Sequence, residues 1–80
     1  MTDYVTNPVL NQLIQLTING KLRNFEPSPL TLDALVTTLG LQGKRLAIER
    51  NGEIVPRSLF QQTLLNTGDK LEIVGAVGGG

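Results

Sequence analysis

The sequence is a chain of 80 residues with seven basic and seven acidic side chains, so its formal charge at neutral pH is zero. This length predicts one small domain, and the balanced charge argues against a general nucleic-acid binder, which would carry a clustered basic patch. The chain contains neither cysteine nor histidine, which excludes disulfide bonds, thiolate nucleophiles and the usual zinc sites. No two carboxylates have a spacing typical of acid–base catalysis, so we expect neither a hydrolase nor a metalloenzyme.

The N-terminal region gives no sign of a membrane or export segment. The longest apolar run is far shorter than a membrane span, and the first residues lack the basic region and long apolar core of a secretory signal. We therefore expect a cytoplasmic protein without membrane contact. Residues 1–12 are weakly patterned, and Pro8 biases Asn7 toward extended backbone. They predict a mobile leader before a domain that spans residues 13–74.

Residues 13–25 predict a β-hairpin. Apolar and polar side chains alternate over residues 13–18, which is typical of a half-buried strand. The inward face of this strand comprises Ile14, Leu16 and Ile18. The Asn19-Gly20 dipeptide follows, and it favours a type I′ turn because both central residues of that turn need a positive φ. Residues 21–25 should return as a short edge strand.

A helix is predicted over residues 31–39, after Pro27-Ser28-Pro29 breaks the chain. Thr31 is a suitable N-cap, and Asp33 in the first turn interacts favourably with the positive end of the helix dipole. Gly40 suits the position after the last helical residues. One apolar stripe runs along the helix and is expected to enter the core: Leu32, Leu35, Val36 and Leu39.

A second hairpin is predicted over residues 46–55. Residues 46–50 and 53–55 form its strands, joined by an Asn51-Gly52 turn. Pro56 then ends the pairing, because proline has no N–H to donate.

The last third of the domain predicts a short helical turn and a final strand. In residues 57–61, Leu59 and Phe60 should cap one end of the core. A turn at residues 66–69 leads into a strand over residues 70–74, with Leu71 and Ile73 facing inward.

These elements follow the order β-β-α-β-β-β, which predicts an α+β layer architecture. So short a chain with this order favours the β-grasp, or ubiquitin-like, fold, a mixed sheet of about five strands covered on one face by one helix. In that fold the last strand commonly pairs beside the first, in the middle of the sheet. Residues 75–80 would then leave an anchored central strand as a flexible tail.

The tail ends in Gly78-Gly79-Gly80. Glycine has no Cβ, so a thread of glycines can enter a narrow active site on another protein. The terminal carboxyl group has a reference pKa of about 3.3–3.7 and is ionised at neutral pH. A partner that holds ATP can activate such a carboxylate as an acyl-adenylate, which a nucleophile then displaces. The alternative is a frayed end without function.

Three segments together carry a family resemblance. They are residues 47–57, which end in Val-Pro-Arg, residues 67–74, a Gly-Asp turn with the last strand, and residues 76–80. In this order they resemble the ThiS type of sulfur carrier protein in thiamine biosynthesis, and the resemblance covers residues 13–80. Two features depart from the family: the leader before Leu13 is longer, and Arg50 stands where many relatives have an apolar residue.

The resemblance implies a carrier that other enzymes act on, and not a catalyst. An adenylating enzyme that uses ATP and magnesium would activate the carboxylate of Gly80. Sulfur delivered as a persulfide by a cysteine desulfurase route would displace AMP and leave a thiocarboxylate, which would donate sulfur to thiazole synthase. The essential pair carries over to Gly79 and Gly80, and Gly78 matches those members that end in three glycines. The carrier itself would be a monomer that binds no metal or cofactor.

Docking on these enzymes requires a surface beside the tail. We expect an exposed, partly apolar patch on the sheet face away from the helix, with Val74 and Ala47 as its residues. Arg57 is a further candidate contact, because its guanidinium suits a carboxylate. The alternative for Arg57 is a solvated side chain after the proline that ends a strand.

Two other functions fit these residues. A carrier for molybdopterin synthesis shares the fold and the terminal glycines but resembles the chain less in the Val-Pro-Arg segment. A β-grasp module that binds protein through its sheet would not depend on the tail, so loss or extension of Gly80 distinguishes it from a carrier. Neutral charge and few aromatic side chains disfavour RNA binding.

Overall fold

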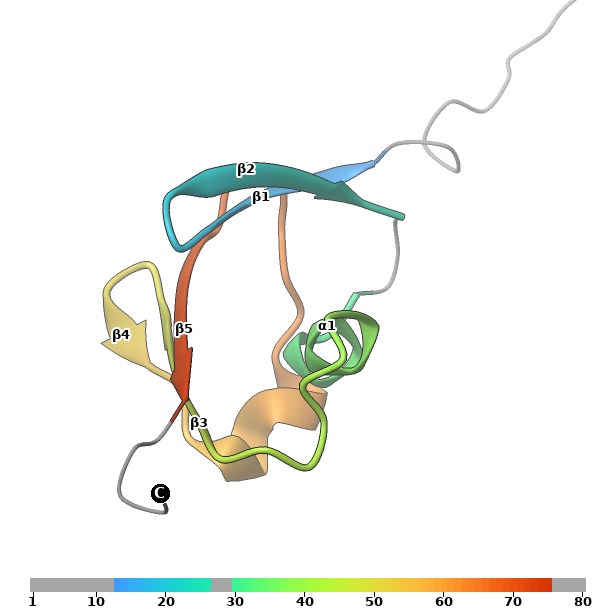
Figure 1. The fold of residues 1–80 in the computed structure, drawn as a ribbon. Helices are drawn as coiled ribbons and strands as arrows, with labels where there is room; N and C mark the ends of the chain where they lie inside the picture. The colour runs from blue at the N-terminus through green and yellow to red at the C-terminus, as the bar shows by residue number, and fades with distance from the viewer. Residues whose placement is uncertain (1–12, 27–29, 76–80) are drawn as a thin grey trace, which may run out of the picture.

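The computed structural model describes residues 13–26 and 30–75. Within them, a five-stranded sheet has an α-helix and a 3-10 helix on one side (Figure 1). In chain order the elements are β1 (Ile14–Ile18), β2 (Lys21–Phe25), α1 (Leu32–Thr38), β3 (Leu46–Arg50), β4 (Glu53–Ile54), the 3-10 helix η3 (Arg57–Gln62) and β5 (Lys70–Gly75). The predicted element order is confirmed. The predicted leader and residues 76–80 of the predicted tail lie outside the described residues.

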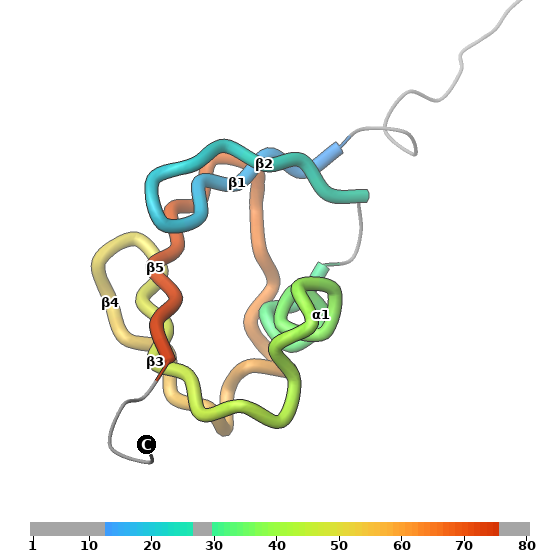
Figure 2. Tube along the Cα trace, in the orientation of Figure 1, coloured from blue at the N-terminus to red at the C-terminus, as the bar shows by residue number. Residues whose placement is uncertain are grey.

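The last strand occupies the centre of the sheet. The strand order is β2-β1-β5-β3-β4, and β5 runs parallel to β1 and antiparallel to β3. Figure 2 shows the trace of β5 between these two neighbours. The expected pairing of the last strand beside the first is therefore confirmed. β5 extends one residue beyond its predicted end, because Gly75 pairs with Leu46.

Both Asn-Gly dipeptides form the turns that the sequence predicts. The φ angles are 50° at Asn19 and 86° at Gly20, and 52° at Asn51 and 89° at Gly52. Positive values at both central residues are the requirement of a type I′ turn, whose twist matches that of the flanking strands. The Asn-Gly turns thus connect the strands of the two hairpins, β1–β2 and β3–β4.

Helix α1 is capped as predicted and is slightly shorter than expected. The Thr31 hydroxyl accepts a hydrogen bond from the backbone N–H of Ala34 at 3.0 Å. The helix ends at Thr38, and Leu39 serves as its C-cap. Leu32 and Leu35 are fully buried, whereas Leu39 is only partly buried at the helix end.

The core lies between the sheet and the two helices α1 and η3. Its buried residues are Leu16, Ile18, Phe25, Leu30, Leu32, Leu35, Val36, Ile48, Phe60, Leu65, Leu71 and Ile73. The prediction that Leu59 caps the core is wrong, because its side chain is 43% exposed while that of Phe60 is 6% exposed. Successive residues of a 3-10 helix point about 120° apart, so η3 turns only one of these neighbours inward.

The outer face of the sheet contains an unfavourable pair. Glu49 and Glu72 are exposed and lie directly opposite each other in the β3–β5 ladder. Like charges in this position destabilise a sheet. Among residues 13–26 and 30–75 the only ion pair joins Arg50 to Asp69, so neither glutamate has a close cationic partner there.

We therefore expect Glu72→Gln to raise the free energy of unfolding by about 0.2–1 kcal/mol at low salt. Urea denaturation would measure the gain, which should shrink at high ionic strength because salt screens exposed charges. Glu26→Gln removes the same charge outside the sheet and is the matched control. An equal gain in both variants would attribute the effect to net charge and contradict the cross-strand explanation.

Candidate functional site

The candidate site is the end of β5, from which the predicted tail continues. Leu71 is fully buried and Ile73 is 7% exposed, so alternate side chains fasten this strand to the core. Its backbone is paired on both sides, with β1 and with β3. Gly78, Gly79 and Gly80 lie outside the described residues, and their role stays a prediction. The described part of the site is therefore the platform that holds the tail.

The two predicted docking residues of the sheet lie side by side on this platform. Ala47 is the direct partner of Val74 in the antiparallel β3–β5 pair, so both side chains project from the same face. Val74 is 57% exposed and Ala47 is also exposed. Their neighbours Ile48 and Ile73 form the next pair of the register and point into the core. The face of Ala47 and Val74 is therefore the one opposite α1.

Sequence reasoning missed a further apolar residue on that face. Ile54 in β4 is 63% exposed and is the direct partner of Glu49. It therefore shares the outer face with Ala47, which lies two residues from Glu49 in β3. The sequence contained a signal for the exposure of Ile54. It lies in the short return strand of the predicted hairpin, and a strand at the edge of a sheet has a neighbouring strand on one side only.

Arg57 lies at the first position of η3, immediately after Pro56. Its side chain is exposed, and its Nη2 donates a hydrogen bond to the carbonyl oxygen of Lys44 at 3.4 Å. This contact places the guanidinium beside the loop that enters β3. The structure thus locates Arg57 close to the start of the strand that pairs with Gly75, while its role in docking stays a prediction.

A buried carboxylate organises the other end of β5. Asp69 is 7% exposed and accepts hydrogen bonds from Arg50 Nε at 2.9 Å, Asn51 Nδ2 at 3.0 Å and the backbone N–H of Asn66 at 2.9 Å. Burial raises the pKa of Asp69, but the three donors and the charge of Arg50 outweigh it, so the pKa lies below its ordinary value. The network accommodates the charge of Arg50 at a partly buried position, where its side chain is 27% exposed.

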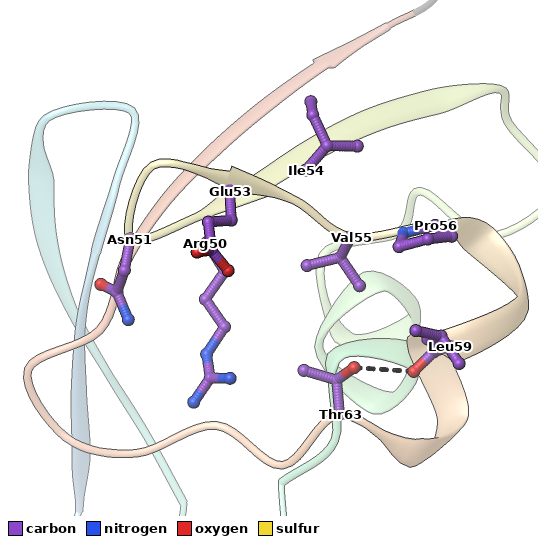
Figure 3. Close-up of a pocket in the computed structure, with 8 residues that line it drawn as sticks. All are labelled: Arg50, Asn51, Glu53, Ile54, Val55, Pro56, Leu59 and Thr63. Carbon is purple, nitrogen blue, oxygen red and sulfur yellow. Dashed lines mark hydrogen bonds between the residues drawn. The ribbon is translucent and has the colours of Figure 1, made fainter.

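A groove lies between the β4 hairpin and η3. Figure 3 shows Arg50 and Val55 on the groove side of the hairpin, facing Thr63 and Leu59. The Thr63 hydroxyl donates a hydrogen bond to the carbonyl oxygen of Leu59 at 2.7 Å. The groove has a volume of about 380 Å³. Arg50 is already engaged with Asp69, and the lining places no nucleophile beside a base.

Residues 13–26 and 30–75 also bear on two other kinds of site, a metal centre and a membrane span. They contain no group of three or more His, Cys, Asp or Glu side chains placed to hold a metal ion. None of their helices combines the length and the apolar character that crossing a membrane requires.

Comparison with known proteins decides the family. The sequence model of the ThiS family matches residues 16–80, which is most of the chain and includes the glycine tail. The chain belongs to the ThiS family. The match takes in both the platform, β5 with its neighbours, and the segment that continues from it.

Individual relatives agree with this assignment. The sulfur carrier protein ThiS of Bacillus subtilis is 34% identical over 65 residues, which cover 81% of this chain and 98% of that protein. The crystal structure of the thiamine biosynthesis protein ThiS from Geobacter metallireducens aligns with a TM-score of 0.72 and 32% identity, covering 84% of this chain and 100% of that one. The β-grasp fold is thereby confirmed.

A third relative is much longer. A thiazole synthase of Paramagnetospirillum magneticum is 51% identical over 67 residues, or 84% of this chain. Those residues make up only 20% of that protein, so the ThiS-family chain spans about a fifth of its length. A segment similar to this chain therefore occurs within a chain named as a thiazole synthase.

The Asp69 network predicts how the stability of this ThiS-family protein depends on pH. The folded-state pKa of Asp69 lies below its unfolded value, so its contribution is complete above the unfolded pKa of about 3.9 and is lost as the pH falls through the folded pKa. We expect Asp69→Asn to cost about 1–3 kcal/mol at neutral pH, because Arg50 loses its partner. Urea denaturation between neutral and strongly acidic pH should show the two proteins converging at the acidic end. Parallel loss of stability in both would contradict this role.

Proposed function

We propose that this chain is the sulfur carrier protein of thiamine biosynthesis and that the sulfur is carried at Gly80. The observation that carries the proposal is the ThiS-family match over residues 16–80. The position of β5 supports it, because a central strand fixed on both sides gives the tail a firm origin. The protein is then a co-substrate that partner enzymes modify.

The chemistry begins with activation of the carboxylate. An adenylating enzyme holding ATP and magnesium joins the carboxylate of Gly80 to the α-phosphate, with release of pyrophosphate. A persulfide supplied by a cysteine desulfurase route then attacks the acyl carbon, and AMP leaves. Cleavage of the sulfur–sulfur bond by a thiol leaves the thiocarboxylate, which thiazole synthase uses as its sulfur donor. ATP and magnesium belong to the partner, and the carrier supplies only the acyl group.

The described residues contribute by presenting the tail. Leu71 and Ile73 hold β5 in the core, and Ala47 and Val74 offer an exposed apolar pair beside the point where the tail begins. We assign partner docking to this pair, with Arg57 as a contact at its edge. Thiazole synthase is a natural partner, since a similar segment occurs within a thiazole synthase chain.

The other candidate functions receive less support. A carrier for molybdopterin synthesis would have the same fold, but the family match and the Bacillus subtilis relative both favour the thiamine pathway. A β-grasp protein-binding module would use the same outer face of the sheet. It differs from a carrier in one respect, since its activity would survive removal of Gly80.

The decisive experiment is the mass of the protein after incubation with the adenylating enzyme of the thiamine pathway, ATP and a sulfur source. We expect exchange of one oxygen for sulfur, dependent on ATP. Oxidation of Met1 adds nearly the same mass, so fragmentation must locate the change at Gly80. A variant lacking Gly80 is the control for position. No change with an enzyme of proven activity would overturn the proposal.

Docking is tested separately by Val74→Asp. A charge in the apolar pair should lower kcat/KM for adenylation by about tenfold, equivalent to about 1.4 kcal/mol, with little effect on stability because the side chain is exposed. Leu22→Asp is the matched control, since Leu22 is also apolar and is 67% exposed but lies in the edge strand β2. Equal kinetics for the Val74 variant and the unaltered protein would remove Val74 from the docking surface.

A further inference from the structure

Three of the seven basic residues gather near the end of β5. Lys44 and Arg45 immediately precede β3, whose first residue, Leu46, pairs with Gly75. Arg57 reaches the same loop from η3 and donates to the carbonyl oxygen of Lys44 at 3.4 Å. Figure 1 shows the loop before β3, η3 and the end of β5 at one end of the molecule. All three basic side chains are exposed.

The negative charges of the sheet lie elsewhere. Glu49, Glu53 and Glu72 are placed toward the turn that joins β3 to β4, at the other end of this hairpin. Asp69 pairs with Arg50, and this is the only ion pair among residues 13–26 and 30–75. In the part of the chain that the structure describes, three exposed cations therefore gather where the tail begins.

We propose that Lys44, Arg45 and Arg57 form a basic rim that docks against acidic side chains around the active-site entrance of thiazole synthase. This inference rests on the proposed carrier function. The occupant is chosen by the occurrence of a similar segment within a thiazole synthase chain. Acidic side chains on that partner are inferred from the charge of the three cations that they would meet. The rim adjoins the apolar pair Ala47 and Val74, and an apolar centre with a charged edge is the usual anatomy of a protein interface.

The rim also solves an electrostatic problem of the tail. The carboxylate or thiocarboxylate of Gly80 is negative, so an entrance lined by carboxylates would repel it. Cations at the base of the tail offset this repulsion and steer the carrier toward the entrance, which raises the association rate more than the final affinity. The hydrogen bond of Arg57 to the carbonyl oxygen of Lys44 places its guanidinium beside the other two cations.

The test measures association of the full chain with its cognate thiazole synthase by stopped flow, at roughly 0.02 M and 1 M salt. Lys44→Gln/Arg45→Gln should lower the association rate constant about five- to tenfold at low salt, with the difference vanishing at high salt. Lys21→Gln/Lys70→Gln removes the same charge from β2 and the far end of β5, and should change the rate less than about twofold. Arg57→Gln should slow association, and Arg57→Lys should restore most of the rate.

The outcomes separate the rim from the carrier function. Equal loss in both double variants, or no loss in either, would overturn the rim while leaving sulfur loading at Gly80 intact. If the unaltered chain fails to bind thiazole synthase although Gly80 is converted to the thiocarboxylate, the synthase is the wrong occupant and the rim assignment falls. Absence of the thiocarboxylate would instead overturn the function on which the inference rests. Thermal unfolding of each variant confirms that the exposed substitutions leave the fold unchanged.

Discussion

The structure depends on the way that β5 is held between β1 and β3. The parallel register with β1 comprises only two residue pairs, Thr17 with Lys70 and Ile18 with Leu71. Side chains extend it: Asn19 Nδ2 donates to the carbonyl oxygen of Ile73 at 3.0 Å, and its Oδ1 accepts from the Ile73 N–H at 2.8 Å. On the other flank, Asn51 Oδ1 accepts from the Lys70 N–H at 2.9 Å. Each hairpin turn therefore also binds the central strand, because its asparagine satisfies backbone groups that a short ladder leaves unpaired.

This arrangement gives a single strand one face that anchors it in the core and one face that is exposed. Leu71 and Ile73 point into the core, whereas Glu72 and Val74 point outward because side chains alternate along a strand. Burial of an aliphatic side chain contributes about 1.5–3 kcal/mol, so the inward residues dominate stability. The outward ones are free to serve partners at little cost to the fold. The glutamate pair of the outer face fits this division, since it contributes nothing favourable to the sheet.

Features that depend on neighbouring residues were predictable from the sequence. Features that depend on contacts between distant residues were not. The Asn-Gly turns, the Thr31 cap and the strand alternation each depend on residues within a few positions, so their patterns sufficed. The orientation of Leu59 depends on which side of η3 meets α1, and the predicted inward position was wrong. The bonds of Asp69 to the side chains of Arg50 and Asn51 join residues 19 and 18 positions apart. The contact of Arg57 with Lys44 spans 13 positions. The choice of Gly80 rested on glycine chemistry and on the family resemblance.

A tail that ends in three glycines leaves partner choice to the body of the proposed carrier. Glycines offer a partner no side chains to recognise, so under the proposed function discrimination between enzymes falls to the surface around β5. The exposed apolar pair Ala47 and Val74, even with Ile54 on the same face, is too small a patch for a stable complex. Lasting interfaces bury about 800 Å² on each partner. A brief association is what the proposed function requires, since a carrier of that kind leaves one enzyme before it reaches the next. Surface charge suits this requirement, because it changes the association rate of a partner without making the complex longer-lived.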